Sequence, residues 1–449
     1  MPGLIGADGF LEVADAALAL EGVDGVEVLF LHEWGGLTRF ASSRIHQSTV
    51  REDTALRVRV VRGNRCGVAS TNAFSREGAH RAAVAAREMA DVAAPDEGFP
   101  GLAPPAAPDE VDRFSETTAS TSPEARAAAV ERLVGMCPPG ATAAGAHETQ
   151  AIEVGLANTE GQRCWSPSTQ ASLSTVITGP DHGSGFAETF AASSDAIDPE
   201  AIGRRAGEKA LGSRDPRPLE PGTYSVVLEP AAVATLVGFL AYEGFGGRAY
   251  LEGRSCFSGR EGELVAAPSI SIREDATDPG TLGTPFDFEG TPRRRVDLIR
   301  DGVFRGVVHD RRTAKQAGIE STGHGLPAPN PEGPFPLNLF LEPGDATVEE
   351  MIAATDRGLL ITRFHYSNVV NPIESSITGM TRDGTFLIER GEVVGPLMNL
   401  RFTQSILAAL AATTMVGRET ELASEFFFSA SRVPALKVDA FHFSGRSDH

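Results

Sequence analysis

Apolar and polar residues alternate along the first part of the chain with two different periods. Residues 10–21 place apolar side chains at helical spacing, and residues 24–31 form an apolar run typical of a strand. Residues 56–60 alternate apolar side chains with arginines before a turn at Gly63-Asn64, which is the pattern of a half-buried hairpin strand. An alanine-rich segment then begins after Ser75, a residue suited to cap a helix. The pattern predicts an α+β unit with antiparallel strands.

A proline- and alanine-rich stretch separates this unit from the next one. Proline at this density stops helices and strands, so we expect a boundary near residue 100. A helix is predicted over residues 122–136, with Ser122 as its N-cap and Pro123 in its first turn. Three strand-like segments and a short helix follow between residues 141 and 213. Together they indicate a second, smaller α+β unit.

Strands and turns dominate the chain from Tyr224 onward. A strand at residues 224–230 leads into an apolar helix at 231–244. Asp-Gly at 301–302 and at 383–384, and Arg-Gly at 390–391, predict tight hairpin turns between apolar strands. Many strands joined by polar turns favour a β-rich barrel or sandwich that carries a few helices.

The length of the chain agrees with this division. Its 449 residues are about three times the size of a typical domain. We therefore predict an α+β protein with an N-terminal α+β domain over residues 1–100, a small central α+β domain over 118–215 and a large β-rich C-terminal domain over 221–447.

Charge and cysteine usage narrow the classes of function. A net charge of -20 argues against a nucleic-acid partner, because phosphate binding needs a basic surface. No apolar stretch approaches the roughly 20 residues that span a bilayer, and the N-terminal segment lacks the basic start of a signal peptide. The four cysteines are scattered and form no CxxC pair, as expected for free thiols in a reducing compartment. We therefore predict a cytoplasmic protein that does not bind membranes.

Catalytic motifs are absent from the sequence. None of the ten histidines has a second histidine within five positions, so no metal-binding histidine pair lies on one helix face. The chain has no GxSxG elbow, no SxxK pair and no phosphate-binding loop with a lysine. Cys256 could act as a nucleophile with His309 or His365 as its base, but nothing in the sequence supports that pairing over a buried cysteine. The residues alone predict no catalytic group and no metal site.

Longer motifs in the C-terminal half carry a resemblance to a known family. The segments "GLLITRFHYSNVVNP", "TRDGTFLIERGE", "NLRFTQS" and "PALKVDAFHFSG" resemble the TldD/PmbA (TldE) family, as does "RVVRGNRCGVASTNAFSREGAH" near the N-terminus. The likeness covers essentially the whole chain in the same order. It implies a three-domain fold and a cytoplasmic peptidase system that cuts unfolded or small peptides inside a closed dimer.

The resemblance also implies two kinds of subunit. TldD-type chains hold zinc through an HExxxH helix and a distal cysteine, whereas TldE/PmbA-type chains lack these ligands and complete the chamber. When "GFLAYEGFGG" is matched to the HExxxH helix, the two histidine positions fall on Gly238 and Glu243 and the glutamate on Phe239. The expected cysteine position, near residues 418–422, holds none. This chain therefore resembles the metal-free branch, with zinc expected only in a TldD-type partner.

The resemblance implies that such a partner subunit closes the chamber and holds an extended peptide by strand addition and loop contacts. Candidate peptide-binding residues come from three segments: Tyr242, Glu243, Arg248, Thr322, His324, His365, Tyr366 and Asn368. Packing and turn formation explain each of them equally well. Two alternatives stay open: a stand-alone peptidase or amidase that uses His324 or His365, and a homodimeric peptide-binding scaffold without a hydrolytic partner.

Overall fold

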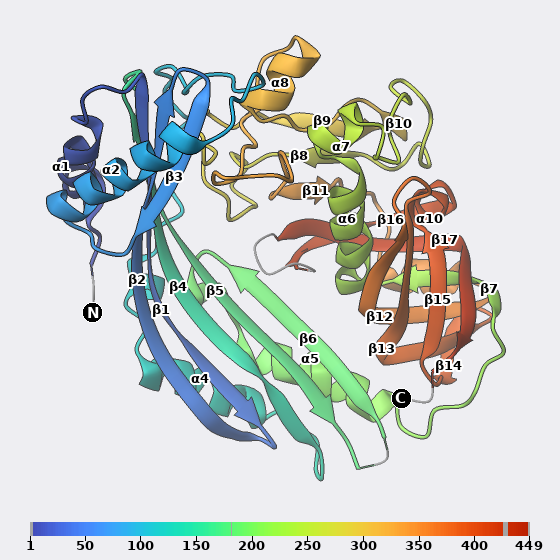
Figure 1. The fold of residues 1–449 in the computed structure, drawn as a ribbon. Helices are drawn as coiled ribbons and strands as arrows, with labels where there is room; N and C mark the ends of the chain where they lie inside the picture. The colour runs from blue at the N-terminus through green and yellow to red at the C-terminus, as the bar shows by residue number, and fades with distance from the viewer. Residues whose placement is uncertain (1–2, 181, 425–429, 448–449) are drawn as a thin grey trace.

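Two β-sheets and the helices packed on them make up the protein. The structure, a computed structural model, describes residues 3–180, 182–424 and 430–447. The N-terminal half forms one sheet, and the C-terminal half forms a barrel with a strand-rich extension (Figure 1). The predicted α+β class and the β-rich C-terminal domain are confirmed.

The N-terminal sheet has six antiparallel strands in the order β3-β2-β1-β4-β5-β6. Its strands are β1 (Gly25–Ala41), β2 (Arg44–Arg62), β3 (Arg65–Thr71), β4 (Thr142–Asn158), β5 (Arg163–Thr178) and β6 (Ser184–Ala191). The β2–β3 hairpin turns at Gly63 and Asn64, as the alternation predicts. Most of these strands are longer than the sequence pattern indicates, because polar residues continue them beyond their apolar cores.

Strands from the two predicted α+β units join in this one sheet. β1 pairs with β4 in an unbroken antiparallel register from Glu27↔Asn158 to Phe40↔Gly145. The proline-rich linker thus separates two segments of sequence whose strands share backbone hydrogen bonds. The composition of the linker gives no sign of this pairing, because the paired residues of β1 and β4 lie more than 100 positions apart in the chain.

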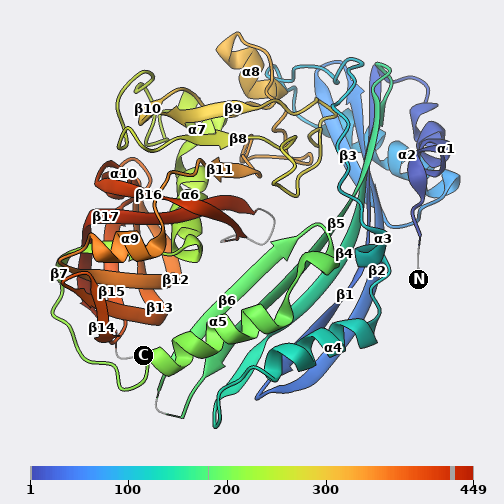
Figure 2. The same ribbon diagram turned by 180° about the vertical axis from the view of Figure 1, so that it is seen from behind.

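One face of the N-terminal sheet carries all of its long helices. Phe30 and Phe40 lie on the same face of β1, because side chains an even number of residues apart share a face. Phe30 packs with helices α1 and α2, and Phe40 packs with helices α4 and α5. These helices are α1 (Gly6–Leu18), α2 (Arg76–Val92), α4 (Pro123–Val134) and α5 (Pro199–Gly212) (Figure 2). The Ser75 and Ser122 hydroxyls cap α2 and α4 as predicted.

Five strands of the C-terminal domain close into a barrel. β7 pairs with both β12 and β17, so the sheet path β7-β12-β13-β15-β17 returns to its first strand. Closure removes the exposed edges that an open sheet would leave. The strands are β7 (Gly222–Leu228), β12 (Arg357–Asn371), β13 (Ser376–Glu389), β15 (Leu400–Ser405) and β17 (Ser431–Arg446).

An extension of short strands and helices continues the barrel sheet toward the N-terminal half (Figures 1 and 2). Strand β11 joins β17 and continues through β8 to β9 and β10. The elements are α6 (Pro230–Gly244), α7 (Gly247–Leu251), β8 (Ile272–Glu274), β9 (Val296–Arg300), β10 (Val303–Phe304), α8 (Arg311–Ala317) and β11 (Leu339–Leu341). The remaining elements of the chain are α3 (Glu116–Ala119), η1 (Ser194–Ala196), α9 (Val348–Ala353), β14 (Glu392–Pro396), α10 (Ile406–Ala411) and β16 (Thr413–Ala423).

The prediction of a hairpin turn at Asp383-Gly384 is wrong. Both residues lie inside β13, where the register with β12 shifts, so they form a bulge in a continuous strand. Asp383 has φ 54° and Gly384 has φ 130°. Asp-Gly pairs adopt such positive φ angles in tight turns as well as in bulges, which is why the sequence predicted a turn. The Asp383 carboxylate is buried and accepts a hydrogen bond from Arg363 Nε at 2.7 Å. The predicted turns at 301–302 and 390–391 are confirmed, since each joins two paired strands.

The face of the N-terminal sheet opposite its helices packs against the C-terminal half. Leu29, Val154 and Leu156 on this face form one apolar cluster with Phe286. Polar contacts surround it: Gln162 donates to the Gly290 carbonyl and Arg113 to the Asp278 carbonyl. The two halves of the chain therefore meet through a buried interface that fixes where the C-terminal helices lie.

Candidate functional site

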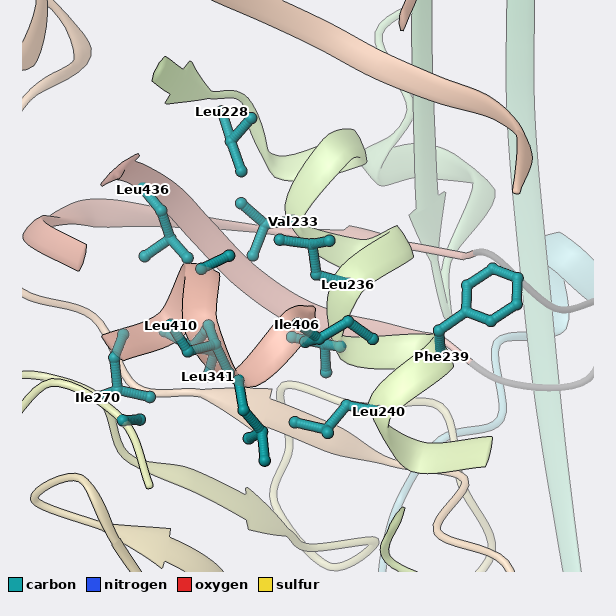
Figure 3. Packing of buried hydrophobic residues seen from close by; sticks show 14 of the residues in the cluster. Leu228, Val233, Leu236, Phe239, Leu240, Ile270, Leu341, Ile406, Leu410 and Leu436 are labelled. Carbon is teal, nitrogen blue, oxygen red and sulfur yellow. The ribbon is translucent and has the colours of Figure 1, made fainter. Parts of the chain in front are cut away.

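Helix α6 is the central element of the C-terminal core. It begins with Pro230 directly after β7, and thirteen of its fifteen residues are buried. A helix that is apolar on all sides is stable only when it is surrounded by protein. Leu236, Phe239 and Leu240 all belong to one cluster with residues of the barrel and the extension, and Phe239 leaves the helix on a different side from the two leucines (Figure 3). The three positions of the family motif lie on this helix.

Glu243 is a buried acidic side chain that forms no ion pair with any described residue. Its side chain lies one turn after Phe239 and therefore on the same side of the helix. The residue is 3% exposed, and neither carboxylate oxygen has a hydrogen-bond partner within the described part of the chain. Burial raises the pKa of Glu243 to about 8. Loss of hydration disfavours the charged form, so the folded protein holds this group as a neutral acid at neutral pH.

The glycines at the end of α6 are required by close packing. A Cβ atom on Gly244 would lie 2.7 Å from the Phe257 ring. A Cβ atom on Gly247 would lie 2.6 Å from His309 Nδ1. Ser255 donates a hydrogen bond of 2.7 Å to the Gly244 carbonyl and so closes the helix end. The glycine-rich stretch is therefore a tight junction between two helices and is unlike a phosphate-binding loop.

Tyr242 and Arg248 lie on either side of this junction. The Tyr242 side chain is 61% exposed, in contrast to its buried neighbour Glu243. Arg248 Nε donates to Glu252 at 2.9 Å, and its Nη1 donates to the Pro331 carbonyl. Arg248 thus ties α7 to the loop that contains residues 322–335.

His324 is buried between a hydroxyl and a carboxylate. Its Nδ1 lies 2.9 Å from Thr322 Oγ1, and its Nε2 lies 3.3 Å from Glu274 Oε1. Both the His324 and the Glu274 side chains are fully buried. Burial alone would raise the pKa of Glu274, but His324, Arg293 and Asn338 together hold it below its usual value. This order of hydroxyl, imidazole and carboxylate resembles a catalytic triad, but its burial gives it the character of a structural network.

His365, Tyr366 and Asn368 form a third group on β12. Tyr366 has φ 50° and is 70% exposed, at an irregularity in the pairing of β12 with β13. The His365 and Tyr366 rings lie 4.4 Å apart, and Asn368 Nδ2 donates to the Tyr366 carbonyl at 3.2 Å. Burial lowers the pKa of His365.

The candidate residues do not form one site. The structure brings Thr322 to His324 and joins His365, Tyr366 and Asn368, and Arg248 reaches the loop after His324. Within residues 3–180, 182–424 and 430–447, no hydrogen bond or ion pair joins the β12 group to the others. Sequence reasoning missed Glu274, Arg293 and Asn338, because nothing in a short run of charged residues or in a single asparagine marks which side chain is buried.

The residues at the motif positions do not fit a catalytic zinc ion. Such an ion takes three protein ligands of nitrogen, sulfur or carboxylate type. Gly238 and Phe239 have no ligand atoms, and residues 418–422 lie in β16 without a cysteine. Among the described residues, no group of three or more His, Cys, Asp or Glu side chains could hold a metal ion. Glu243 alone supplies a single carboxylate.

Models of known protein families match the chain over most of its length. The PmbA/TldA metallopeptidase domain 1 matches residues 26–90, the central domain matches 110–214 and the C-terminal domain matches 221–445. The chain belongs to the PmbA/TldD family. The three matched regions follow one another in the order that the family resemblance in the sequence implies.

Individual PmbA/TldD relatives agree with this assignment. A metalloprotease of Methanothermobacter thermautotrophicus is 27% identical over 237 residues, which cover 51% of this chain and 50% of the relative. Metalloprotease PmbA of Escherichia coli O157:H7 is 25% identical over 280 residues, covering 60% of this chain and 59% of PmbA. The chain thus spans about half the length of the first curated relatives it matches.

The crystal structure of TldE from Thermococcus kodakarensis has the same fold. It matches with a TM-score of 0.89 at 22% identity and covers 98% of this chain and 99% of its own. No helix of the described PmbA/TldD chain is long and apolar enough to cross a membrane.

Proposed function

We propose that this chain is a non-catalytic, TldE/PmbA-like subunit of a TldD/TldE-type metallopeptidase that degrades unfolded or small peptides in the cytoplasm. In this proposal the catalytic zinc belongs to a TldD-type partner with an HExxxH helix, and this chain needs no cofactor. Its contribution is to complete the chamber wall and to hold the peptide near the partner's site.

The observation that carries the proposal is the composition of α6. The helix keeps its place in the core, but its motif positions hold Gly238, Phe239 and Glu243. A zinc peptidase needs ligand atoms and a carboxylate base that activates water. These three residues supply neither two imidazoles nor a base at the second motif position. Peptide hydrolysis by the family's chemistry therefore requires another chain.

Exposure divides the candidate peptide-binding residues. Tyr242, Tyr366 and Asn368 are exposed to solvent, so a peptide can approach their side chains. His324 and Glu243 are buried, so they act in binding only if a neighbouring segment moves. We therefore assign direct peptide contact to the exposed group and a supporting role to the buried pair.

Metal analysis combined with a mixing experiment tests the proposal. The purified chain is assayed for bound zinc and for cleavage of unfolded proteins and short peptides, alone and with an HExxxH-bearing relative. We expect substoichiometric zinc and no cleavage alone, and faster cleavage or a changed cleavage pattern when the relative is added. Stoichiometric zinc, or cleavage by the chain alone, would contradict the proposal.

The two alternatives give different results in the same experiment. A stand-alone peptidase would cleave alone and lose activity in His324→Ala or His365→Ala, with a folded protein verified by circular dichroism. The burial of His324 between Thr322 and Glu274 disfavours it as an accessible base. A peptide-binding scaffold would bind peptides but would neither bind an HExxxH-bearing relative nor change its activity.

A further inference from the structure

The contact between α5, β6 and the barrel differs in character from the apolar contact around Phe286. Helix α5 and strand β6 approach β13 and β16, and most of the side chains that meet there are charged (Figures 1 and 2). We call this contact the polar seam. It consists of Phe186 and Glu188 of β6, Arg205 and Lys209 of α5, and Glu229, Thr362, Arg363, Asp383 and Glu421 of the C-terminal half.

Ion pairs join the two sides of the polar seam. Lys209 Nζ lies 2.6 Å from each oxygen of the Glu229 carboxylate and 3.0 Å from Thr362 Oγ1. Arg205 Nη1 lies 2.9 Å from both carboxylate oxygens of Glu421. The side chains of Lys209 and Glu229 are each 13% exposed, whereas those of Arg205 and Glu421 are 34% and 41% exposed. One pair is thus sheltered, and the other is accessible to solvent.

The buried apolar clusters beside the seam do not cross it. The cluster around Phe40 and α5 contains residues of the N-terminal half alone. The cluster of Val227 and Phe386 contains residues of the C-terminal half alone. Phe186 meets the other side through a charge, because the Arg363 guanidinium lies 4.0 Å from the centre of its ring. Among the described residues, charged groups rather than an apolar cluster therefore bridge the seam.

Glu188 adds a proton-sensitive group to the seam. Its side chain is half-buried, and burial raises the pKa of Glu188 to about 7. The described charged groups that face it are Arg363 of β12, Glu421 of β16 and Arg205 of α5. The two arginines favour its charged form, and Glu421 opposes it. On β5, its neighbour in the strand pairing is the uncharged Ser174. The closed seam therefore holds the proton of Glu188 more tightly than water would.

The link between α5 and the barrel sets a limit on movement at the seam. Ser213 is bound to β6, since its hydroxyl donates to the Ser184 carbonyl and accepts from the Ser184 N–H. Arg217 is bound to the barrel half, since its N–H donates to the Pro396 carbonyl at 3.1 Å. Residues 214–216 join these two anchors, and an extended chain of this length spans about 14 Å at most. Any opening is therefore small.

We propose that the polar seam is a charge-held latch, at which α5 and β6 part from the barrel while the apolar contact around Phe286 stays closed. Parting returns the Arg205–Glu421 and Lys209–Glu229 pairs to water, so regained hydration offsets much of the lost attraction. Salt screens the attraction between partly exposed charges, and it therefore favours the open form. The latch is a property of this chain by itself and does not depend on the proposed function.

A rise in pH also favours the open form, because Glu188 ionises more readily in water. Its pKa rises from 4.5 in water to about 7 in the closed seam. The ratio of open to closed chains therefore increases with pH through this window and is constant outside it. Between pH 6 and pH 8 the increase is up to about tenfold, and screening by water at a half-buried group makes it smaller.

Distances between two spin labels test the proposal in the full chain. Glu208→Cys on α5 and Arg357→Cys on β12 place the labels at exposed positions on opposite sides of the seam. The half-buried thiols are removed by Cys66→Ser and Cys137→Ser. Double electron–electron resonance then gives the distribution of label distances at pH 6 and pH 8, each at low and at high sodium chloride concentration. We expect a second, longer distance whose share increases with pH and with salt.

Charge reversal with rescue identifies the groups that hold the latch. Arg205→Glu should increase the share of the longer distance already at pH 6, and Arg205→Glu/Glu421→Arg should restore the natural distribution. Glu188→Gln should keep the response to salt and lose the response to pH. Arg81→Glu is the matched control, because it breaks an exposed ion pair with Glu77 inside α2 and should change nothing. Circular dichroism verifies that each variant is folded.

Labels at Glu131→Cys on α4 and Glu208→Cys on α5 lie in the same half and provide the internal reference. Their distance should be the same under all four conditions. A change in this reference distance would overturn the proposal, because the movement would then not be that of one half against the other. An unchanged distribution across the seam under all four conditions would also overturn it. The same holds for Arg205→Glu with the natural distribution, or for a double variant as open as Arg205→Glu.

Discussion

The buried carboxylate of Glu243 makes the stability of the folded chain depend on pH. Its pKa is raised by burial from 4.5 to about 8. A carboxyl group whose pKa is raised in the folded state holds its proton more tightly there than in the unfolded chain. Stability is therefore highest below pH 4.5 with respect to this group, and it falls as pH rises through the window from 4.5 to 8.

Glu243→Gln removes this dependence while keeping the size and shape of the side chain. Each pH unit within the window corresponds to about 1.4 kcal/mol, so the charged form costs about 4 to 5 kcal/mol above pH 8. The residue is 3% exposed, and solvent screening reduces this cost little. We expect the variant and the natural chain to have similar free energies of unfolding near pH 5. The variant should be more stable by about 4 kcal/mol at pH 9.

Urea denaturation followed by far-ultraviolet circular dichroism at pH 5, 7 and 9 measures this difference. The helices and the barrel both contribute to that signal, and equal m-values would show that the same structure unfolds in both proteins. Glu208→Gln, an exposed glutamate on α5, serves as the control and should show no such trend. A difference between Glu243→Gln and the natural chain that stays constant from pH 5 to 9 would refute the reasoning. So would a variant that is less stable at pH 9.

Three further substitutions or labelling experiments follow from the geometry. Gly247→Ala should destabilise the chain by about 1 to 3 kcal/mol, because its Cβ would lie 2.7 Å from the Val308 carbonyl oxygen. Gly395→Ala is the control: the space around Gly395 is open, so this variant should not lower the melting temperature. Gly384→Ala should also lower the melting temperature, since φ is 130° and the new Cβ would lie 2.4 Å from Thr362 Oγ1; an unchanged melting temperature would contradict the bulge. Burial raises the pKa of Cys256 to about 12, so its thiol should react slowly at neutral pH. A thiol reagent should label the half-buried Cys66 and Cys137 first and should label Cys256 only when the chain unfolds. Peptide mapping of the labelled protein measures this order.

Local sequence patterns predicted the elements of the fold well. Caps at Ser75 and Ser122 and the turn at Gly63-Asn64 depend on residues within a few positions of one another. Asp383-Gly384 shows the limit of this reasoning, because positive φ angles serve a turn and a bulge equally. Only the pairing of β12 with β13 on both sides of the bulge decides between them, and that pairing is a property of the whole barrel.

The candidate site was predictable only where its residues lie close together in the sequence. Aligning α6 with a family motif identified Gly238, Phe239 and Glu243, because a helix is one continuous segment of sequence. The network of His324 with Glu274 and Asn338 combines residues from strands and loops that are distant in sequence. A sequence pattern cannot show that Glu274 is buried against His324. Nor can it show that Tyr242 is exposed beside the buried Glu243.

The packing of α6 explains why this helix persists without ligands at its motif positions. Leu236 and Leu240 of α6 pack with Ile406 and Leu436 of the surrounding elements, so the helix holds the barrel and the extension together. Burying one such leucine contributes about 1.5 to 3 kcal/mol, which is a large share of the stability of a typical domain. Deleting the helix would therefore unfold the domain, and changing Gly238 or Phe239 would also disturb packing, because both are buried and Phe239 belongs to this cluster. The burial of α6 therefore accounts for the place of this helix in the fold without reference to ligand binding.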